Sequence, residues 1–125
     1  MMGQAEKVPA GAACDPDIFD RDHLNHYTMS IPGLDAEVVG LFLAQLPETI
    51  SMIECARSAA DWKLATHTLK GSASSVGARR INQIAASLEE LRVDGEEKVK
   101  ALRIQLLKAA AAEFRETAGL HFRTP

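Results

Sequence analysis

The sequence predicts an all-α fold, an up-and-down antiparallel four-helix bundle with a short additional N-terminal helix. From Asp35 onward, apolar residues recur at a spacing of about 3.6 residues, which is the period of an α-helix with one buried face. Alternation of β-branched and polar residues is nowhere sustained, so we expect no strand. The connections between the long amphipathic segments are short, which favours antiparallel neighbours in a bundle.

The short N-terminal helix is predicted near Asp20 to Met29, because Pro32 and Gly33 then break the chain. The first long helix is expected from about Leu34 to Ala60. Pro47 interrupts this segment, and because the apolar stripe keeps its phase across the proline we expect one kinked helix rather than two. The predicted inward residues of this helix are Val38, Leu41, Phe42, Leu46, Ile50 and Ile53.

Three further helices complete the predicted bundle. Asp61 is expected to cap a helix that begins at Trp62 and ends at Gly77. The next helix is expected over residues 78–93, before the "DG" pair, and the last over residues 96–118, which starts with acidic residues suited to a helix N-terminus. The predicted inward residues of these three helices are Trp62, Ala65, Leu69, Ala73 and Val76; Ile81, Ile84, Leu88 and Leu91; and Val99, Leu102, Leu106, Ala110 and Phe114.

The 125 residues suffice for one domain with a single core. We expect residues 1–16 to form a flexible N-terminal extension, residues 17–120 the bundle, and residues 121–125 a C-terminal tail. Apolar residues make up 46% of the chain and charged residues 25%, which argues against disorder or a fibrous fold.

Charge and cysteine content narrow the class of function. A net charge of -3 gives no attraction to nucleic acid or an anionic membrane, so we expect neither as a partner. No signal peptide or membrane-spanning run is evident, and Cys14 and Cys55 are expected to be reduced, so a cytoplasmic location is predicted. His23 and His26 stand three apart, but without an evident third ligand we expect no metal site.

The segment "HTLKGSASSVGARRI" at 67–81 gives the second bundle helix an unusual outer face. At about 100° per residue, His67 lies roughly 200° from Leu69, so a helix that buries Leu69 turns His67 toward solvent. The residues that share this face are polar or small, namely Lys63, Lys70, Gly71 and Ser74.

Lys70 and Gly71 give the exposed histidine a special environment. Side chains on a helix lean toward its N-terminus, so Lys70 leans back toward His67, whereas Gly71 has no side chain to lay over the ring. A glycine inside a helix costs about 1 kcal/mol relative to alanine, and close approach of another molecule would explain it. The pattern predicts an exposed nucleophile with a neighbouring cation and an open landing surface.

These groups suit phosphoryl transfer. Imidazole is a good nucleophile that is largely neutral near pH 7, and phosphoryl transfer depends mainly on in-line positioning and on cations such as Lys70. An acceptor on the other ring nitrogen would fix the tautomer and leave Nε2 free to attack. Glu89, on the next antiparallel helix, is a plausible acceptor.

The stretch "HTLKGSASSVG" at 67–77 resembles the signature of histidine-containing phosphotransfer (HPt) domains, which carry phosphoryl groups between receiver domains in two-component phosphorelays. The resemblance extends from about Val38 through Leu91 and includes "AADW", "GARRI" and "LEEL". It implies a four-helix bundle with the phosphoacceptor at His67. The family's lysine beside the histidine is matched by Lys70, and its small-residue platform by Gly71 and Ser72. Gly77 matches the glycine that closes the helix, and Glu89 stands where the family has a Gln or Glu that can contact the ring.

We therefore expect a phosphocarrier that accepts a phosphoryl group from a receiver-domain aspartyl phosphate and relays it to another receiver. No glycine-rich nucleotide loop is seen, so we expect no ATP site, no cofactor of its own, and Mg²⁺ only on the receiver. A hybrid histidine kinase is the other expected partner, and the chain is expected to be a monomer. Docking is expected around His67, at Gly71, Ser74, Ala78 and Ala86, with Lys63, Ser72 and Gly77 as further binding candidates.

Two other readings remain open at this point. The bundle could be a phosphorylation-independent adaptor that binds and inhibits a receiver or a kinase, although such an adaptor has no need of His67. It could also be a fragment of an ATP-consuming histidine kinase, which would dimerise through such a bundle. Labelling of His67 separates the first alternative from a phosphocarrier, and a monomeric state would count against the second.

Overall fold

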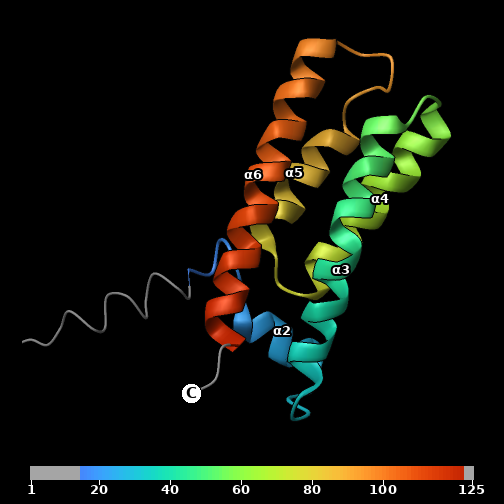
Figure 1. Cartoon of the computed structure of the whole chain (residues 1–125). Helices are drawn as coiled ribbons and strands as arrows, with labels where there is room; N and C mark the ends of the chain where they lie inside the picture. Colours follow the sequence, from blue (N-terminus) through green and yellow to red (C-terminus); the bar gives the residue numbers. More distant parts are fainter. Residues whose placement is uncertain (1–14, 123–125) are drawn as a thin grey trace, which may run out of the picture.

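The computed structural model describes residues 15–122, and within this range it contains five α-helices and no strand. They are α2 (Arg21–Tyr27), α3 (Leu34–Cys55), α4 (Ala59–Ser75), α5 (Arg79–Glu89) and α6 (Glu97–Phe122). Each of the four long helices contacts the next along the chain, and α3 also contacts α6, so together they surround one core. The short α2 lies at the end of this bundle where α3 begins (Figure 1). The predicted all-α class is confirmed.

Helix α2 begins at a cap that the sequence placed inside the helix. The Asp20 carboxylate accepts a hydrogen bond from the backbone N–H of His23 at 3.1 Å, so Asp20 is the N-cap residue. The helix ends at Tyr27, two residues earlier than predicted. Met29 and Ser30 then adopt positive φ angles of 56° and 55°, which turn the chain toward α3.

Helix α3 is one continuous helix through Pro47, so the alternative of two helices is wrong. A proline has no N–H to donate to the carbonyl four residues earlier, which here belongs to Leu43. The guanidinium Nη2 of Arg115, on α6, donates to that carbonyl at 3.2 Å. The gap that the proline makes in α3 is therefore filled by a side chain from a neighbouring helix. The degree of kinking stays a prediction.

The turn between α3 and α4 corrects the prediction at two points. Helix α3 ends at Cys55 rather than Ala60, because Ala56 has extended backbone angles. The N-cap of α4 is Ser58, whose hydroxyl oxygen accepts from the backbone N–H of Asp61 at 3.1 Å. Asp61 therefore lies in the first turn of the helix, where its charge suits the positive end of the helix dipole, and it is not the cap.

Gly77 ends α4 and holds the N-terminal segment against the bundle. Its φ is +78°, and two reverse hydrogen bonds close the helix, from Gly77 N–H to the carbonyl of Ser74 and from Ala78 N–H to that of Ala73. The Gly77 carbonyl accepts from the Asp20 N–H at 2.7 Å. A Cβ on Gly77 would collide with the Asp20 carbonyl oxygen, so the contact requires glycine.

The last two helices differ from their predicted limits in opposite directions. Helix α5 ends at Glu89, four residues before the predicted end, whereas α6 continues to Phe122. The predicted C-terminal tail is thus wrong for His121 and Phe122. His121 is half-buried, with its ring centroid 5.5 Å from that of Phe19 and its Nδ1 3.1 Å from Nη1 of Arg21. Residues 1–14 of the predicted flexible extension and 123–125 of the predicted tail lie outside the described residues.

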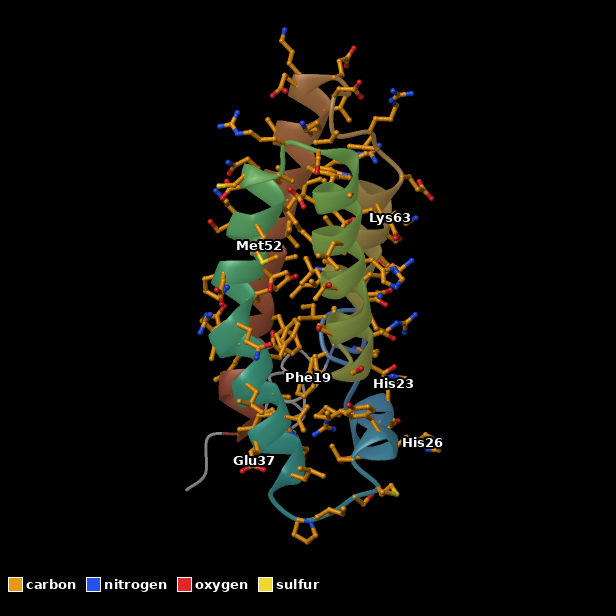
Figure 2. All side chains as sticks on the ribbon, turned by 90° about the vertical axis from the view of Figure 1, so that its right-hand side faces the viewer. Phe19, His23, His26, Glu37, Met52 and Lys63 are labelled. Carbon is orange, nitrogen blue, oxygen red and sulfur yellow. The ribbon has the colours of Figure 1, made fainter. Side chains whose placement is uncertain are left out.

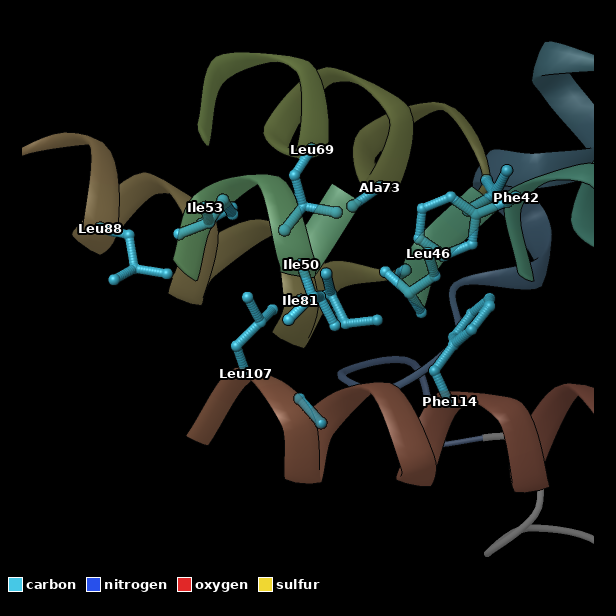
Figure 3. Close-up of a cluster of buried hydrophobic side chains, with 14 of the residues drawn as sticks. Phe42, Leu46, Ile50, Ile53, Leu69, Ala73, Ile81, Leu88, Leu107 and Phe114 are labelled. Atoms are coloured by element: carbon cyan, nitrogen blue, oxygen red, sulfur yellow. The ribbon is translucent and has the colours of Figure 1, made fainter. Parts of the chain in front are cut away.

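The core is built from side chains of all four long helices, which converge in Figure 3. Trp62 is buried, and its indole N–H donates to the carbonyl of Leu88 at 3.0 Å. Three predicted core residues are exposed instead: Leu41 at 60%, Leu102 at 62% and Leu106 at 51%. Leu41 and Leu106 each have an apolar neighbour in the sequence, Phe42 and Leu107, that is buried in their place. The inward residues of α6 are Leu107, Ala110, Phe114 and Ala118.

Helix α3 is also long and apolar enough to cross a membrane by length and composition alone, with a mean hydropathy of 1.3 over its most apolar window. The expectation that the chain has no membrane-spanning run was therefore wrong by the criterion of length and composition. In the bundle, its most apolar side packs into the protein core. The core residues it contributes are Val39, Phe42, Leu46, Ile50 and Ile53.

Candidate functional site

His67 stands in the middle of α4 on the face that points away from the core. Its side chain is 67% exposed, whereas Leu69, two residues later, is 1% exposed. The predicted outward orientation is confirmed. The same helix thus supplies one wall of the core and, on its opposite side, the exposed imidazole.

Glu89, at the last turn of α5, gathers three side chains of α4 around its carboxylate. Its Oε2 lies 3.1 Å from Nδ1 of His67, and its Oε1 accepts a hydrogen bond from Nζ of Lys70 at 2.7 Å. Nζ of Lys63 is 3.9 Å from Oε2. Only 13% of the Glu89 side chain is exposed, so this carboxylate is the least solvated member of the cluster. The sequence prediction that Glu89 reaches the His67 ring is confirmed.

Lys70 and His67 hold the pKa of Glu89 below its ordinary value, so its carboxylate is ionised at neutral pH. The hydrogen bond from Lys70 lowers the pKa of Glu89, burial opposes this effect, and the hydrogen bond to His67 lowers the pKa further. An ionised carboxylate can only accept hydrogen bonds, so Nδ1 of His67 must be the donor. A neutral ring that carries its proton on Nδ1 has its lone pair on Nε2. Among the described residues, no hydrogen-bond partner of Nε2 is found.

Lys70 contacts Glu89, whereas the sequence placed its ammonium group beside the His67 ring. Its ammonium group is bonded to the same carboxylate as the imidazole, and the closest contact found for it is Glu89 rather than the ring itself. The backbone beneath it is fixed from α5, because Nδ2 of Asn82 donates to the Lys70 carbonyl at 2.8 Å. Sequence reasoning did not single out Asn82. Asn82 could have been found as a polar residue on the half-buried side of α5 that faces α4.

The surface next to His67 on its C-terminal side is open. Gly71 is exposed, and a Cβ built on it would meet no atom within 4 Å. Ser72 and Ser74 are also exposed on α4. The predicted open space at Gly71 is confirmed, and nothing in the packing of the bundle requires a glycine there. That a partner docks on this surface stays a prediction.

Two predicted members of the docking surface are not on it. Ala78 is fully buried, at 0% exposure, and Gly77 is buried beneath Asp20. The tight turn that ends α4 carries both residues inward, so neither is available to a partner. Ala86 is half-buried on α5.

A shallow apolar hollow adjoins His67 on the other side, toward the start of α4. It is lined by Ala59, Ala60, Lys63, Leu64 and His67, and Leu64 is 61% exposed. The sequence reasoning did not include Ala60 or Leu64 in the docking surface. The signal was present, because Leu64 is out of phase with the buried stripe of α4 and so must face solvent.

A comparison with protein families matches the model of the Hpt domain to residues 37–117, which is more than half of the chain. The chain belongs to the Hpt domain family. No curated protein and no solved structure matched it. Hpt domains are phosphocarrier modules of two-component systems that interact with receiver domains and histidine kinases. Residues 37–117 of this Hpt domain include His67, Lys70, Gly71 and Glu89.

The described residues 15–122 contain no group of three or more His, Cys, Asp or Glu side chains that could hold a metal ion. His23 and His26 both lie on the short helix α2, near the lower end of the view in Figure 2, whereas Lys63 of α4 lies near the upper end. The polar groups gathered around His67 are the Glu89 carboxylate and the ammonium groups of Lys63 and Lys70.

Proposed function

We propose that His67 accepts a phosphoryl group from the aspartyl phosphate of a receiver domain and relays it to a second receiver in a multistep pathway. The observation that carries this proposal is the environment of the two nitrogens of the His67 ring. Its Nδ1 is 3.1 Å from an ionised carboxylate, and its Nε2 faces a side of α4 that is open to solvent. This is the arrangement that a nucleophilic imidazole needs at neutral pH.

Charge on the outer face of α4 favours the transfer. Lys63 and Lys70 bring two positive charges to the single negative charge of Glu89, so the cluster has a net charge of +1 when the ring is neutral. A transferred phosphoryl group spreads negative charge over its equatorial oxygens, and nearby ammonium groups offset it. Lys63 is 75% exposed and can turn toward such a group at little cost.

The partner's approach is proposed to cover α4 from the Ala60 and Leu64 hollow, across His67, to Gly71 and Ser74. These residues lie on one exposed face of a single helix, so one rigid partner surface can cover them. The apolar hollow supplies contact area, and the bare backbone at Gly71 lets the aspartyl phosphate come close to Nε2.

The remaining parts of the proposal follow from this role. The topology is inferred to be an up-and-down four-helix bundle, because neighbours in the chain are neighbours in space and successive turns alternate between the two ends (Figure 1). We further propose a monomer that acts in the cytoplasm with receivers and a hybrid histidine kinase. It carries no cofactor, and Mg²⁺ belongs to the receiver.

Incubation with a phosphorylated receiver domain tests the proposal. The chain should acquire an acid-labile, alkali-stable label that is lost in His67→Gln and retained in His23→Gln, a matched control at an exposed histidine on α2. A second, unlabelled receiver should then remove the label. If no receiver labels the protein, or if His67→Gln is still labelled, the proposal is wrong. Equal receiver binding by unlabelled protein and His67→Gln would then favour the adaptor.

A further inference from the structure

Glu89 contacts the ring nitrogen that does not carry the phosphoryl group. Its Oε2 is 3.1 Å from Nδ1, while the proposed nucleophile is Nε2 at the far side of the ring. A carboxylate in this place orients the imidazole before transfer. The same contact also persists in the chemistry that follows, because Nδ1 remains beside Glu89 once Nε2 is occupied.

The protonation state of Nδ1 decides how readily phosphohistidine gives up its phosphoryl group. If Nδ1 carries a proton, the Nε2–P bond can break to leave a neutral imidazole. If Nδ1 has lost that proton, the same bond cleavage must expel an imidazolate anion, which is a far poorer leaving group. A negative charge within about 4–6 Å of a protonated nitrogen favours the protonated form.

We propose that Glu89 is a positioning residue that keeps the proton on Nδ1 of phosphorylated His67, and so keeps the imidazole a neutral leaving group for onward transfer. This inference rests on the proposed phosphocarrier function. It adds that Glu89 sets the pH range over which the phosphorylated protein can deliver its group, in addition to fixing the ring before phosphorylation.

The steps balance without any added proton donor. In the forward step, the Nε2 lone pair forms the N–P bond, the P–O bond to the receiver's aspartate breaks, and the aspartate leaves as a carboxylate. The ring then bears a positive charge, with its proton still on Nδ1 and bonded to Glu89. In the onward step, the N–P electron pair returns to Nε2, an aspartate oxygen of the second receiver takes the phosphoryl group, and neutral Nδ1–H imidazole is restored.

The other charged groups near Glu89 do not replace it. Lys63 and Lys70 on α4 are cations, which disfavour a positive ring, and their ammonium groups lie 3.9 and 2.7 Å from the Glu89 carboxylate. Arg92 and Asp94, in the segment after α5, pair with each other at 3.1 Å. From α6, the ammonium group of Lys100 donates to the Val93 carbonyl and stands over the Trp62 ring. Glu90 is exposed.

Glu89→Gln separates charge from geometry. Glutamine keeps an oxygen that can accept from Nδ1–H at the same reach, but it carries no charge. Glu90→Gln is the matched control, because it removes one carboxylate from the adjacent residue without touching the ring. Lys70→Met leaves Glu89 charged and removes its strongest hydrogen-bond partner, so it reports on the lysine alone.

The first readout is the titration of phosphorylated His67 itself. The full chain is phosphorylated with phosphoramidate, and the ³¹P resonance of His67 is identified by its loss in His67→Gln. The pH at which half of the phosphohistidine is protonated should fall by about one to two pH units in Glu89→Gln. It should stay unchanged in Glu90→Gln and should not fall in Lys70→Met.

The second readout is the pH dependence of phosphoryl transfer to a receiver. In Glu89→Gln the rate constant should decline at a pH lower by the same interval, so that at alkaline pH the variant is at least about tenfold slower than the wild type. Equal midpoints and superimposable pH profiles in the two proteins would overturn the inference. That failure is distinct from failure of the proposed function, in which a receiver never labels His67 at all.

Discussion

Two glycines six residues apart, Gly71 inside α4 and Gly77 just past its end, have opposite relations to the fold. Gly71 has helical backbone, is exposed, and has nothing within 4 Å of the place where a Cβ would be. Gly77 has a φ of +78°, is buried, and packs its backbone against that of Asp20. The fold needs a glycine at position 77 and would accept almost any residue at position 71. A glycine that the fold does not need is the one that points to a partner.

The largest effect is expected from Gly77→Ala, which tests whether the fold requires a glycine at this position. We expect the free energy of unfolding to fall by about 2–4 kcal/mol, because alanine is strained at positive φ and its Cβ meets the Asp20 backbone. Urea denaturation followed by circular dichroism measures the loss. The variant should still accept phosphate on His67 while it is folded. A loss below about 0.5 kcal/mol would show that the Asp20 segment moves away without consequence.

The opposite half of the comparison is tested by Gly71→Gln. Glutamine restores a helix-favouring side chain, so stability should change by less than about 1 kcal/mol and toward greater stability. Because the new side chain leans over the imidazole, transfer from a phosphorylated receiver should be slowed by roughly 10–100-fold. Gly71→Ala is the matched control, since it has the same backbone effect with little cover. Equal transfer rates in the two variants and the wild type would contradict the landing-surface argument.

A smaller effect is expected from pH at the segment that Gly77 anchors. Arg21 bonds to His121 on α6, and burial, followed by the Arg21 charge, lowers the pKa of His121. The unfolded chain therefore binds this proton at a higher pH than the folded chain does. Stability is fully present above the unfolded pKa of about 6.5 and declines as the pH falls through and below it.

Urea midpoints at pH 7.5 and 5.5 measure this decline, and His121→Gln should reduce it. The lowered pKa of Glu89 acts with the same sign, but only as the pH falls below its ordinary value of 4.5. In Gly77→Ala the decline should also be smaller, because the segment that carries Arg21 is then already loosened. A pH dependence unchanged in both variants would show that this end of the bundle is held by its aromatic contacts alone.

The sequence was sufficient for the helical class and for the outward orientation of His67, because both depend on local periodicity. Burial of Leu69 dictates exposure of His67 whatever packs on the helix, whereas the contact of His67 with Glu89 also depends on how α4 and α5 are aligned. The position of Lys70 was less predictable. A flexible side chain chooses among nearby acceptors, and the acceptor at 2.7 Å is a carboxylate from another helix.

The incorrect predictions concern helix caps and buried faces that are decided by contacts between distant parts of the chain. Ser58 and Asp61 are both good caps, and only the extended backbone at Ser58 selects one of them. Leu106 and Leu107 offer two phases for α6, and packing against α3 and α5 selects Leu107. The burial of Gly77 depends on the Asp20 segment folding across it, a contact between residues 57 positions apart that no local pattern reveals.

Because of Pro47, the backbone hydrogen bonding of α3 depends on Arg115 of α6. The guanidinium group that completes the backbone of α3 is supplied from late in α6, so the first long helix becomes fully bonded only after most of the chain has been synthesised. Shortened versions of the protein that stop before position 115 would retain every residue around the imidazole and yet leave the Leu43 carbonyl without its side-chain donor, bonded to water instead. Where the C-terminal boundary is drawn for recombinant work thus matters to a helix that lies about seventy residues upstream.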